Sequence, residues 1–372
     1  MRIYIIGSKG IPSASIQGSG GVERHVEQIA TRLVDRGHEV FVYVRNSSHY
    51  AAQEWNGVKL IRVPFLPGKN TATITHVFLS TLHVLFQRAD IIHFHGVGSS
   101  TLAWIPRLLK WKSKIVATFH SRDWFDTKWS RFARWYLQFG EWSAVHFPHK
   151  TIAVSHVIQV FCRKSYNKQV AYIPNGADIP APQGVELLSA FNLKANEYLL
   201  GVGRLVPNKA YDIAIEAFRD VVTDKKLVIV GEAFHSSHYD QKLRLLAEKD
   251  PRVILLGYQS GEPLKQVLAH AYAFVHPSRA EGLSVAIIEA MANAKLVIMS
   301  DIKENLELVD HSGLAYTTDD VKALTVAMQL VVDDPEMTRQ RGLRAREVVR
   351  KEYSWDSVIL RLEELYKELL DH

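Results

Sequence analysis

The chain has 372 residues, of which 47% are hydrophobic and 23% charged, and its formal net charge is +6. This length exceeds one ordinary core and favours two domains, and the composition is that of a globular protein, which excludes a largely disordered chain. The basic surplus fits phosphate-bearing ligands, nucleic acid or an anionic membrane surface, and does not choose among them.

Three features of the sequence bear on its location. Cys162 is the only cysteine, so no internal disulfide can form and a reducing cytoplasm is favoured. The apolar run at the N-terminus ends at Gly7, too early for the core of a signal peptide. The nearest candidate for a membrane span, residues 77–86, contains polar side chains and falls short of the roughly 18 apolar residues required. We therefore expect a cytoplasmic protein.

The first half alternates short apolar runs with amphipathic helical stretches, the pattern of a parallel sheet covered by helices. A buried strand is predicted at residues 2–7, followed by a Gly-rich loop and a helix from about Gly21 to Arg36. Gly37 is expected to end that helix, where a positive φ is needed. Further strands are expected in HEVFVYV, VKLIRVP, DIIHFH, KIVATFH, KTIAVS and AYIPNG.

A probable linker follows, because Pro180, Pro182 and Gly184 stand close together. The alternation then restarts, with strands expected in YLLGVGR, KLVIVGE, RVILLGY, YAFVHPS and LVIMSD. Residues 355–370 form an amphipathic helix. We predict an α/β protein with two Rossmann-like, doubly wound domains at residues 1–178 and 179–352, followed by a helix at 353–372.

A dinucleotide enzyme is the first alternative for such a fold. Its G-x-G-x-x-G pattern is not met, because Gly201 and Gly203 are followed by Val206 at the third position. The glycines after the first strand, Gly7 and Gly10, are also wrongly spaced, and no acidic residue ends the second strand to hold a ribose. No P-loop pattern occurs either. A dinucleotide enzyme and a P-loop protein are therefore both disfavoured.

The second half carries two charged motifs, each at a junction between an expected strand and an expected helix. Arg204 and Lys209 stand in the pattern GRLxxxK, and two cations there can hold a diphosphate. Glu281 and Glu289 flank a stretch in which residues 282–284 are expected to start a helix, whose N–H groups attract phosphate. Glu289, two turns into it, could accept hydrogen bonds from a ribose. Either motif alone is compatible with solvated surface charge; together they favour a nucleotide-diphosphate site.

These motifs resemble the large retaining glycosyltransferase family 4, which has the GT-B fold with two domains facing across a cleft. The resemblance extends over nearly the whole chain. It includes the Gly-rich loop GSGGVE (residues 18–23), the strand IIHFHG (91–96), the strand end TFH (118–120) and the turn YIPNGAD (172–178). The last helix is similar to the one that crosses back to the first domain in GT-B proteins.

A narrower resemblance concerns a subgroup that includes bacterial rhamnosyltransferases of surface polysaccharides. GSKGIP (residues 7–12) is similar to its start, and residues 120–129 are similar to its HGxDWxxxKW stretch. This chain departs from the subgroup with Ser121 in place of Gly, with a longer first loop, and with Ala210 after the motif lysine. The first two departures concern the acceptor side, so the resemblance leaves the acceptor open.

The motifs and the resemblance imply roles for individual residues. Those expected to act in catalysis are His120, Arg204, Lys209 and Glu281. Those expected to bind the donor are Gly20, Gly21, Gly203, Gly257, Tyr258, Gly282, Leu283, Ser284, Val285 and Glu289. Those expected near the acceptor are Glu23, Asp123, Trp124 and Lys128. The donor base is expected near the Gly257–Tyr258 strand end, and domain closure is expected to exclude water.

No metal or other cofactor is expected. His93 and His95 lie two apart on one strand, but the sequence places no third ligand, so packing or polar lining is the favoured interpretation. Asp-x-Asp, the metal-binding pair of the other major glycosyltransferase fold, is missing from the sequence. The Trp-rich, basic stretch at residues 104–142 has two interpretations of about equal weight, core packing or an acceptor surface near lipid headgroups.

The predicted function is therefore transfer of a hexose or deoxyhexose, with rhamnose as a candidate, from a nucleotide-diphosphate sugar. The acceptor is a saccharide or lipid-linked saccharide in polysaccharide biosynthesis, reached at the inner face of the cell membrane. The alternatives are another GT-B enzyme, such as a pyridoxal-phosphate-dependent phosphorylase or a nucleotide-sugar epimerase, and a basic nucleic-acid-binding protein. The last is disfavoured, because no helix gathers Lys and Arg on one face, and no nucleic-acid partner is expected.

Overall fold

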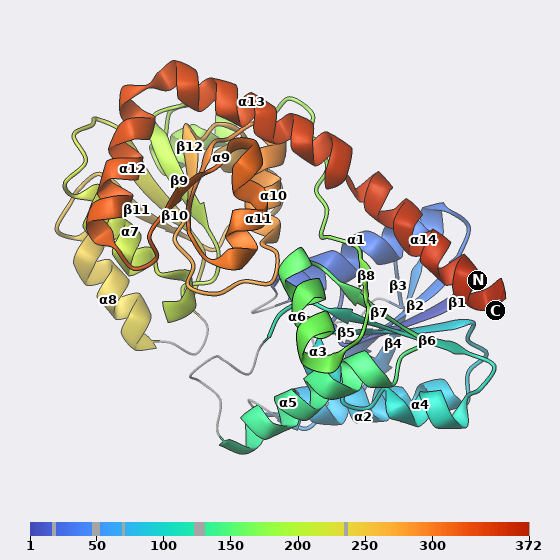
Figure 1. Ribbon diagram of the computed structural model, residues 1–372. Coiled ribbons are helices and arrows are strands. Elements are labelled where there is room, and N and C mark those ends of the chain that lie inside the picture. The colour runs from blue at the N-terminus through green and yellow to red at the C-terminus, as the bar shows by residue number, and fades with distance from the viewer. Residues whose placement is uncertain (17–19, 47–52, 69–70, 123–130, 234–236, 372) are drawn as a thin grey trace. The chain divides into compact units, whose positions relative to one another are not determined.

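The structure, a computed structural model, describes residues 1–16, 20–46, 53–68, 71–122, 131–233 and 237–371 (Figure 1). The chain divides into two compact units. Unit 1 comprises Met1–Asn175 and Trp355–His372, and unit 2 comprises Gly176–Ser354. The division falls after residue 175, close to the expected 178, and the side chain of Asn175 is hydrogen-bonded to His25 of unit 1.

Unit 1 is built on an eight-stranded sheet in the order β3-β4-β2-β1-β5-β6-β7-β8, in which only the β3–β4 pair is antiparallel. The strands are β1 (Arg2–Ile6), β2 (Glu39–Arg45), β3 (Glu54–Trp55), β4 (Val58–Val63), β5 (Ile91–His95), β6 (Lys114–Phe119), β7 (Lys150–Ala153) and β8 (Ala171–Tyr172). The helices are η1 (Ser13–Ser15), α1 (Gly21–Asp35), α2 (Thr71–Leu85), α3 (Val97–Ser100), α4 (Trp104–Leu109), α5 (Arg131–His146), α6 (His156–Tyr166) and α14 (Trp355–Asp371).

Both faces of the unit 1 sheet are buried, and alternate residues of β1 face opposite layers. Ile3 and Ile5 join a core cluster with the apolar faces of α1 and α14, whereas Tyr4 and Ile6 join one with α2 (Figure 1). Each fully buried aliphatic or aromatic side chain contributes about 1.5–3 kcal/mol. The apolar stripe of the last helix, with Leu362 and Tyr366, therefore fixes α14 to unit 1.

Unit 2 has a six-stranded, wholly parallel sheet in the order β11-β10-β9-β12-β13-β14. The strands are β9 (Tyr198–Val202), β10 (Lys226–Val230), β11 (Val253–Gly257), β12 (Ala273–His276), β13 (Val297–Ser300) and β14 (Leu314–Tyr316). The helices are η3 (Glu186–Phe191), η4 (Pro207–Lys209), α7 (Tyr211–Phe218), α8 (Ser237–Ala247), α9 (Gly261–Ala269), α10 (Val285–Ala292), α11 (Lys303–Ser312), α12 (Val321–Asp333) and α13 (Pro335–Glu352). The predicted α/β fold class, with two parallel-sheet domains, is confirmed.

The strand order locates the edge of each sheet where ligands bind. In doubly wound sheets this is the carboxyl edge, at the point where the strand order reverses. In unit 1 the reversal falls beside β1, and in unit 2 beside β9. Gly7 follows β1 with φ +117°, and a Cβ at this position would lie 2.3 Å from the carbonyl oxygen of His95, so only glycine fits.

Among the described residues, no helix combines the length and the apolar composition that crossing a bilayer requires.

Candidate active site

In unit 2, three polar side chains meet at the carboxyl ends of β9 and β12. Lys209 ends η4, and its Nζ lies 2.5 Å from Oε1 of Glu281. The same carboxylate oxygen lies 2.9 Å from Nε2 of His276, the last residue of β12. The side chains of Lys209, Glu281 and His276 are 17%, 12% and 0% exposed. The predicted catalytic pair, Lys209 and Glu281, is thus brought together in a largely buried ion pair.

Electrostatics fix the ionisation of this cluster. Burial by itself would raise the pKa of Glu281, but the positive charge of Lys209 and the hydrogen bond from His276 outweigh it and hold the pKa well below its ordinary value. Burial lowers the pKa of His276, against the opposing effect of Glu281. Glu281 is therefore an anion at neutral pH, and Lys209 is held beside it.

The turn that carries Lys209 is fixed by Arg279, a residue that sequence reasoning missed. The backbone N–H of Arg279 donates to the carbonyl oxygen of Asn208 at 2.8 Å, and its guanidinium donates to the carbonyl oxygen of Pro207. Nε of Arg279 also lies 2.6 Å from Oδ1 of Asp319. His276 was missed as well. Both residues belong to the HPSR segment immediately before Glu281, and that proximity is the signal that could have identified them.

The loop after β9 holds the other predicted cation. Arg204 is exposed, and its side chain has no hydrogen bond or ion pair with any other residue that the structure describes. Gly203 lies against Tyr211, so closely that a Cβ on Gly203 would be 2.8 Å from the Tyr211 hydroxyl oxygen. That hydroxyl is buried with no hydrogen-bond partner among the described residues, and burial raises its pKa.

The expected phosphate-binding helix is α10, with one correction. Residues 282–284 are not helical, because Ser284 is the N-cap with extended backbone (φ −71°, ψ 114°) and the helix begins at Val285. Glu289 therefore lies one turn into α10, not two, and is half-buried. The first N–H groups of a helix have no partner within it, which makes this end suited to an anion.

The remaining predicted donor residues lie at the edge strand of the same sheet. Gly257 ends β11 with φ +72°, and Tyr258 follows with 46% of its surface exposed. Both stand at the carboxyl edge of the sheet, as the sequence indicates, on the side of β10 away from β9. Their contact with a nucleobase stays a prediction.

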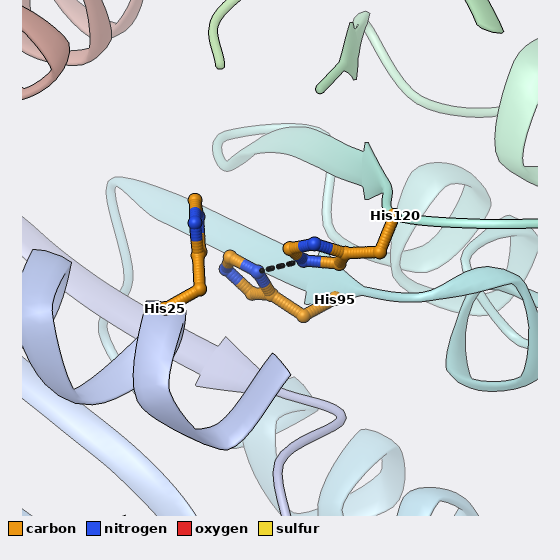
Figure 2. A group of neighbouring side chains, drawn as sticks. All are labelled: His25, His95 and His120. Carbon is orange, nitrogen blue, oxygen red and sulfur yellow. Dashed lines mark hydrogen bonds between the residues drawn. The ribbon is translucent and has the colours of Figure 1, made fainter. Parts of the chain in front are cut away.

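In unit 1, three histidines meet at the carboxyl edge of the sheet (Figure 2). His25 comes from α1, His95 ends β5 and His120 follows β6. Nδ1 of His95 lies 3.1 Å from Nε2 of His120, and Nδ1 of His25 lies 2.9 Å from Oδ1 of Asn175. All three imidazoles are buried. Of this group the sequence predicted only His120 as a site residue.

These imidazoles are neutral at physiological pH. Burial lowers the pKa of His25 to about 4, despite its hydrogen bond to Asn175. Burial also lowers the pKa of His95 and His120 well below the ordinary value, with neighbouring histidines adding to the effect. The edge therefore offers uncharged hydrogen-bonding groups.

His93 is used differently. Its Nδ1 lies 2.6 Å from the Tyr366 hydroxyl and its Nε2 lies 2.7 Å from Oγ1 of Thr118, so both ring nitrogens are occupied inside the core. Its contact with Tyr366 links β5 to α14.

Of the four residues predicted near the acceptor, the structure describes Glu23. Both carboxylate oxygens of Glu23 accept backbone hydrogen bonds, from Gly20 at 2.8 Å and from Lys9 at 3.4 Å, so Glu23 holds the Gly-rich loop against the start of α1. Gly20 and Gly21 are the N-cap and first residue of α1. Asp123, Trp124 and Lys128 lie outside the described residues. Contact of any of these residues with an acceptor stays a prediction.

Comparisons with known proteins match both units. Residues 19–180 match the model of Glycosyltransferase Family 4, and residues 189–348 match that of Glycosyl transferases group 1. An uncharacterized glycosyltransferase of Methanocaldococcus jannaschii is 25% identical, over 97% of this chain and 98% of its own. The phosphatidyl-myo-inositol mannosyltransferase of Mycolicibacterium smegmatis is 24% identical, over 94% of this chain and 90% of its own.

Solved structures show the same fold over the whole chain. Sucrose-phosphate synthase from Thermosynechococcus elongatus superposes with a TM-score of 0.86 at 22% identity, covering 100% of this chain and 99% of its own. Anabaena HepE in complex with UDP-glucose superposes with a TM-score of 0.82 at 20% identity, covering 99% and 100%. With a family 4 domain in its first half and a group 1 domain in its second, the chain is a glycosyltransferase of the GT-B fold.

Proposed function

We propose that this enzyme transfers a hexosyl or deoxyhexosyl group, with rhamnose as a candidate, from a nucleoside-diphosphate sugar to a saccharide or lipid-linked saccharide in polysaccharide biosynthesis. The observation that carries the proposal is the Lys209–Glu281–His276 cluster in unit 2. The N-terminus of helix α10 follows four residues after Glu281. Two of the similar proteins support the substrate classes: a phosphatidyl-myo-inositol mannosyltransferase, and HepE, whose structure is in complex with UDP-glucose.

The cations account for departure of the leaving group. As the bond between the sugar carbon and the β-phosphate oxygen breaks, negative charge grows on that phosphate, and fixed donors aimed at it lower the barrier. Lys209, Arg204 and the amides near residues 283–285 are the proposed donors. Glu281 holds Lys209 in place and contacts the donor sugar, while Glu289 accepts hydrogen bonds from the ribose. His120 is proposed to contact the transferred sugar.

The proposed reaction retains the configuration of the sugar carbon. The acceptor oxygen attacks on the face that the phosphate leaves, the new carbon–oxygen bond forms there, and the acceptor proton passes to the departing phosphate oxygen. No residue is assigned as a covalent nucleophile. Proton NMR of the product gives the test: an anomeric configuration opposite to that of the donor would refute retention.

Catalysis is proposed to need no divalent cation, because Arg204 and Lys209 supply the positive charge and the sequence has no Asp-x-Asp pair. We expect turnover to survive incubation with EDTA followed by assay in chelator. Loss of turnover that magnesium or manganese restores would contradict this proposal.

The donor is identified by a thermal-shift screen with UDP, GDP, dTDP and ADP, followed by their sugars. One nucleotide should raise the unfolding temperature, because a ligand that binds only the folded state stabilises it in proportion to the logarithm of its concentration. The same nucleotide should fail to shift a Lys209→Ala variant at equal concentration. No shift with any nucleotide would count against the diphosphate site, and a visible absorbance band from pyridoxal phosphate would favour the phosphorylase alternative.

The proposed acceptor side includes an anionic membrane surface. The tryptophans at 104, 111, 135 and 142 are all partly or largely exposed, by 38%, 77%, 61% and 40%. At the ends of α2 and α4, an apolar-basic face exposes 87% of Phe86, 66% of Leu108 and 67% of Leu109. Arg88, Arg107, Trp111 and Lys112, which follow or belong to these helix ends, are exposed as well, and Lys110 is half-buried. Nζ of Lys110 donates to the carbonyl oxygen of Leu85 at 3.3 Å, which ties the two helix ends together.

An apolar surface with interspersed cations fits anionic lipid headgroups, which attract each nearby basic residue by about 1 kcal/mol. We expect the enzyme to sediment with vesicles that contain anionic lipid, and to be released as salt screens the charges. Leu108→Ser combined with Trp111→Ser should weaken binding. The matched control is Val222→Ser combined with Val326→Ser in unit 2, where the native residues are 81% and 68% exposed. Equal binding by both double variants would refute the assignment of this face.

A further inference from the structure

The three histidines of unit 1 have an arrangement that goes beyond hydrogen bonding. One ring nitrogen from each of His25, His95 and His120 lies within 4.8 Å of the other two (Figure 2). A tetrahedral zinc ion holds imidazole nitrogens at about 2.0–2.1 Å, so its ligand atoms stand roughly 3.3–3.4 Å apart. The ligand nitrogens must close from separations of up to 4.8 Å, and the 3.1 Å hydrogen bond between Nδ1 of His95 and Nε2 of His120 gives way as the rings move toward a common centre.

The surroundings of His25 orient it as a ligand. Nδ1 of His25 faces the amide oxygen of Asn175 at 2.9 Å, so the ring N–H is donated there and Nε2 keeps its lone pair. Histidines that bind metals usually donate their other ring N–H to such an oxygen, and this outer partner tunes the affinity.

His95 supplies a second, independent observation. Its Nε2 is buried and has no hydrogen-bond partner among the described residues. Leaving a buried polar atom without a partner destabilises the folded state. A bound ion, or a water that it carries, would satisfy this nitrogen. The ring of His93 lies beside that of His95 at a centroid distance of 4.1 Å and is tilted by 40°, but its own nitrogens are occupied, so it is a neighbour and not a ligand.

The donor set decides which ions fit. Three neutral imidazoles without a carboxylate suit zinc and its neighbours among the late first-row metals. Magnesium and calcium prefer oxygen ligands and are excluded. We propose that His25, His95 and His120 bind one divalent ion of the zinc class, with the fourth coordination position open to water or to a substrate hydroxyl.

The ion is expected to inhibit the enzyme. Zinc on His120 would remove the group that contacts the transferred sugar, so zinc should lower turnover and EDTA should restore it. This consequence rests on the proposed function, whereas the binding itself does not, and the two are measured separately.

Binding is tested on the full chain with any affinity tag removed, since a polyhistidine tag binds the same metals. Cobalt(II) titration should give visible absorption bands of tetrahedral type that saturate at one ion per chain. Added zinc should abolish these bands and added magnesium should not. Equilibrium dialysis should find one zinc per chain.

Variants then assign the site. His95→Asn and His120→Asn should each abolish the cobalt bands, and Asn175→Ala, which removes only the outer partner, should weaken zinc binding by roughly 10–100-fold. The control is His156→Asn, which removes an exposed histidine of the same unit. Circular dichroism and tryptophan fluorescence check that each variant is folded. Absence of cobalt bands in the wild type, or unchanged bands in folded His95→Asn and His120→Asn, overturns the site. Stoichiometric binding without inhibition overturns only the role of His120 at the sugar.

Discussion

The two units place polar sites at the same edge of similar parallel sheets, yet the sites have opposite electrostatic character. The unit 2 site is ionic: Lys209 and Glu281 form a largely buried ion pair supported by His276. The unit 1 site is neutral, since burial keeps its three histidines unprotonated. The shared fold positions both sites, and the side chains alone decide that one suits a charged diphosphate and the other suits uncharged groups.

The largest expected effect comes from removing charge in unit 2. Lys209→Ala and Arg204→Ala should each lower turnover roughly 10²–10³-fold, the usual cost of losing one contact to a developing oxyanion. Steady-state kinetics with the donor found by the thermal-shift screen gives the measurement. Lys265→Ala is the matched control, because Lys265 forms an exposed pair with Glu262. Near-wild-type turnover in both folded variants would refute the role of Lys209 and Arg204 at the diphosphate of the donor.

Unit 2 was the better predicted of the two, for a physical reason. Its charged motifs lie in single loops at strand–helix junctions, so local sequence places Lys209 and Glu281 at the same edge. The start of α10 was set too early because Ser284 caps the helix with extended backbone. Arg279 was missed because its role is to donate to the backbone of residues 207 and 208, and local sequence does not encode which distant carbonyls a guanidinium will reach.

The neutral site of unit 1 could not be predicted as a group. His25, His95 and His120 are brought together by α1, β5 and the end of β6, and their juxtaposition depends on the strand order β1-β5-β6. The spacing of the three histidines along the sequence does not reveal that strand order. By contrast, the end of α1 was predicted correctly at Gly37, which has φ +83°, because a helix end with a left-handed residue is a local signal.

Acid should distinguish the units by their stability. Burial lowers the pKa of His25 and His76 to about 4, so folding keeps them neutral while the unfolded chain takes up protons near pH 6.5. Their contribution to stability is complete above pH 6.5 and is lost as the pH falls toward 4. Among the described residues, the other histidines of unit 1 with lowered pKa values are His38, His93, His95, His120 and His149.

Unit 2 should keep its stability to a lower pH than unit 1. In unit 2, burial lowers the pKa of His276. The pKa of Glu281 is lowered from 4.5, so its contribution to stability is present above that value and is lost only as the pH falls below it. Unit 1 should therefore lose stability first as pH decreases.

The tryptophans allow this order to be measured. All eight lie in residues 1–175 or 355–372, so tryptophan fluorescence reports on unit 1, whereas far-ultraviolet circular dichroism reports on both units. On titration from pH 7 to 3, the fluorescence change should precede the final loss of dichroism. His76→Leu should move the fluorescence transition to lower pH, and His156→Leu, at an exposed position, should leave it in place. Coincident transitions below pH 4 would contradict the proposed difference.

The smallest effect concerns two equivalent helix ends. In unit 1, α1 is followed by Gly37, and the N–H of the next residue, His38, donates to the carbonyl oxygen of Leu33. In unit 2, α10 has the same arrangement around Ala294, where Lys295 donates to Ala290. The residue between is left-handed in both cases, with φ +83° at Gly37 and +56° at Ala294. Only glycine adopts this backbone conformation without a steric penalty.

The two positions therefore predict opposite effects of reciprocal substitutions. A left-handed conformation costs a residue with a Cβ about 1–2 kcal/mol, while glycine loses about 0.5–1 kcal/mol more backbone entropy on folding than alanine. Ala294→Gly should thus raise the stability of unit 2 by roughly 0.5–1 kcal/mol. Gly37→Ala should lower that of unit 1 by a similar amount, because nothing lies within 4 Å of the added Cβ and the effect is purely conformational. Urea unfolding followed by circular dichroism and by tryptophan fluorescence measures the two changes. If both substitutions shift stability in the same direction, the helix ends are not equivalent, and neighbouring packing instead of backbone conformation controls them.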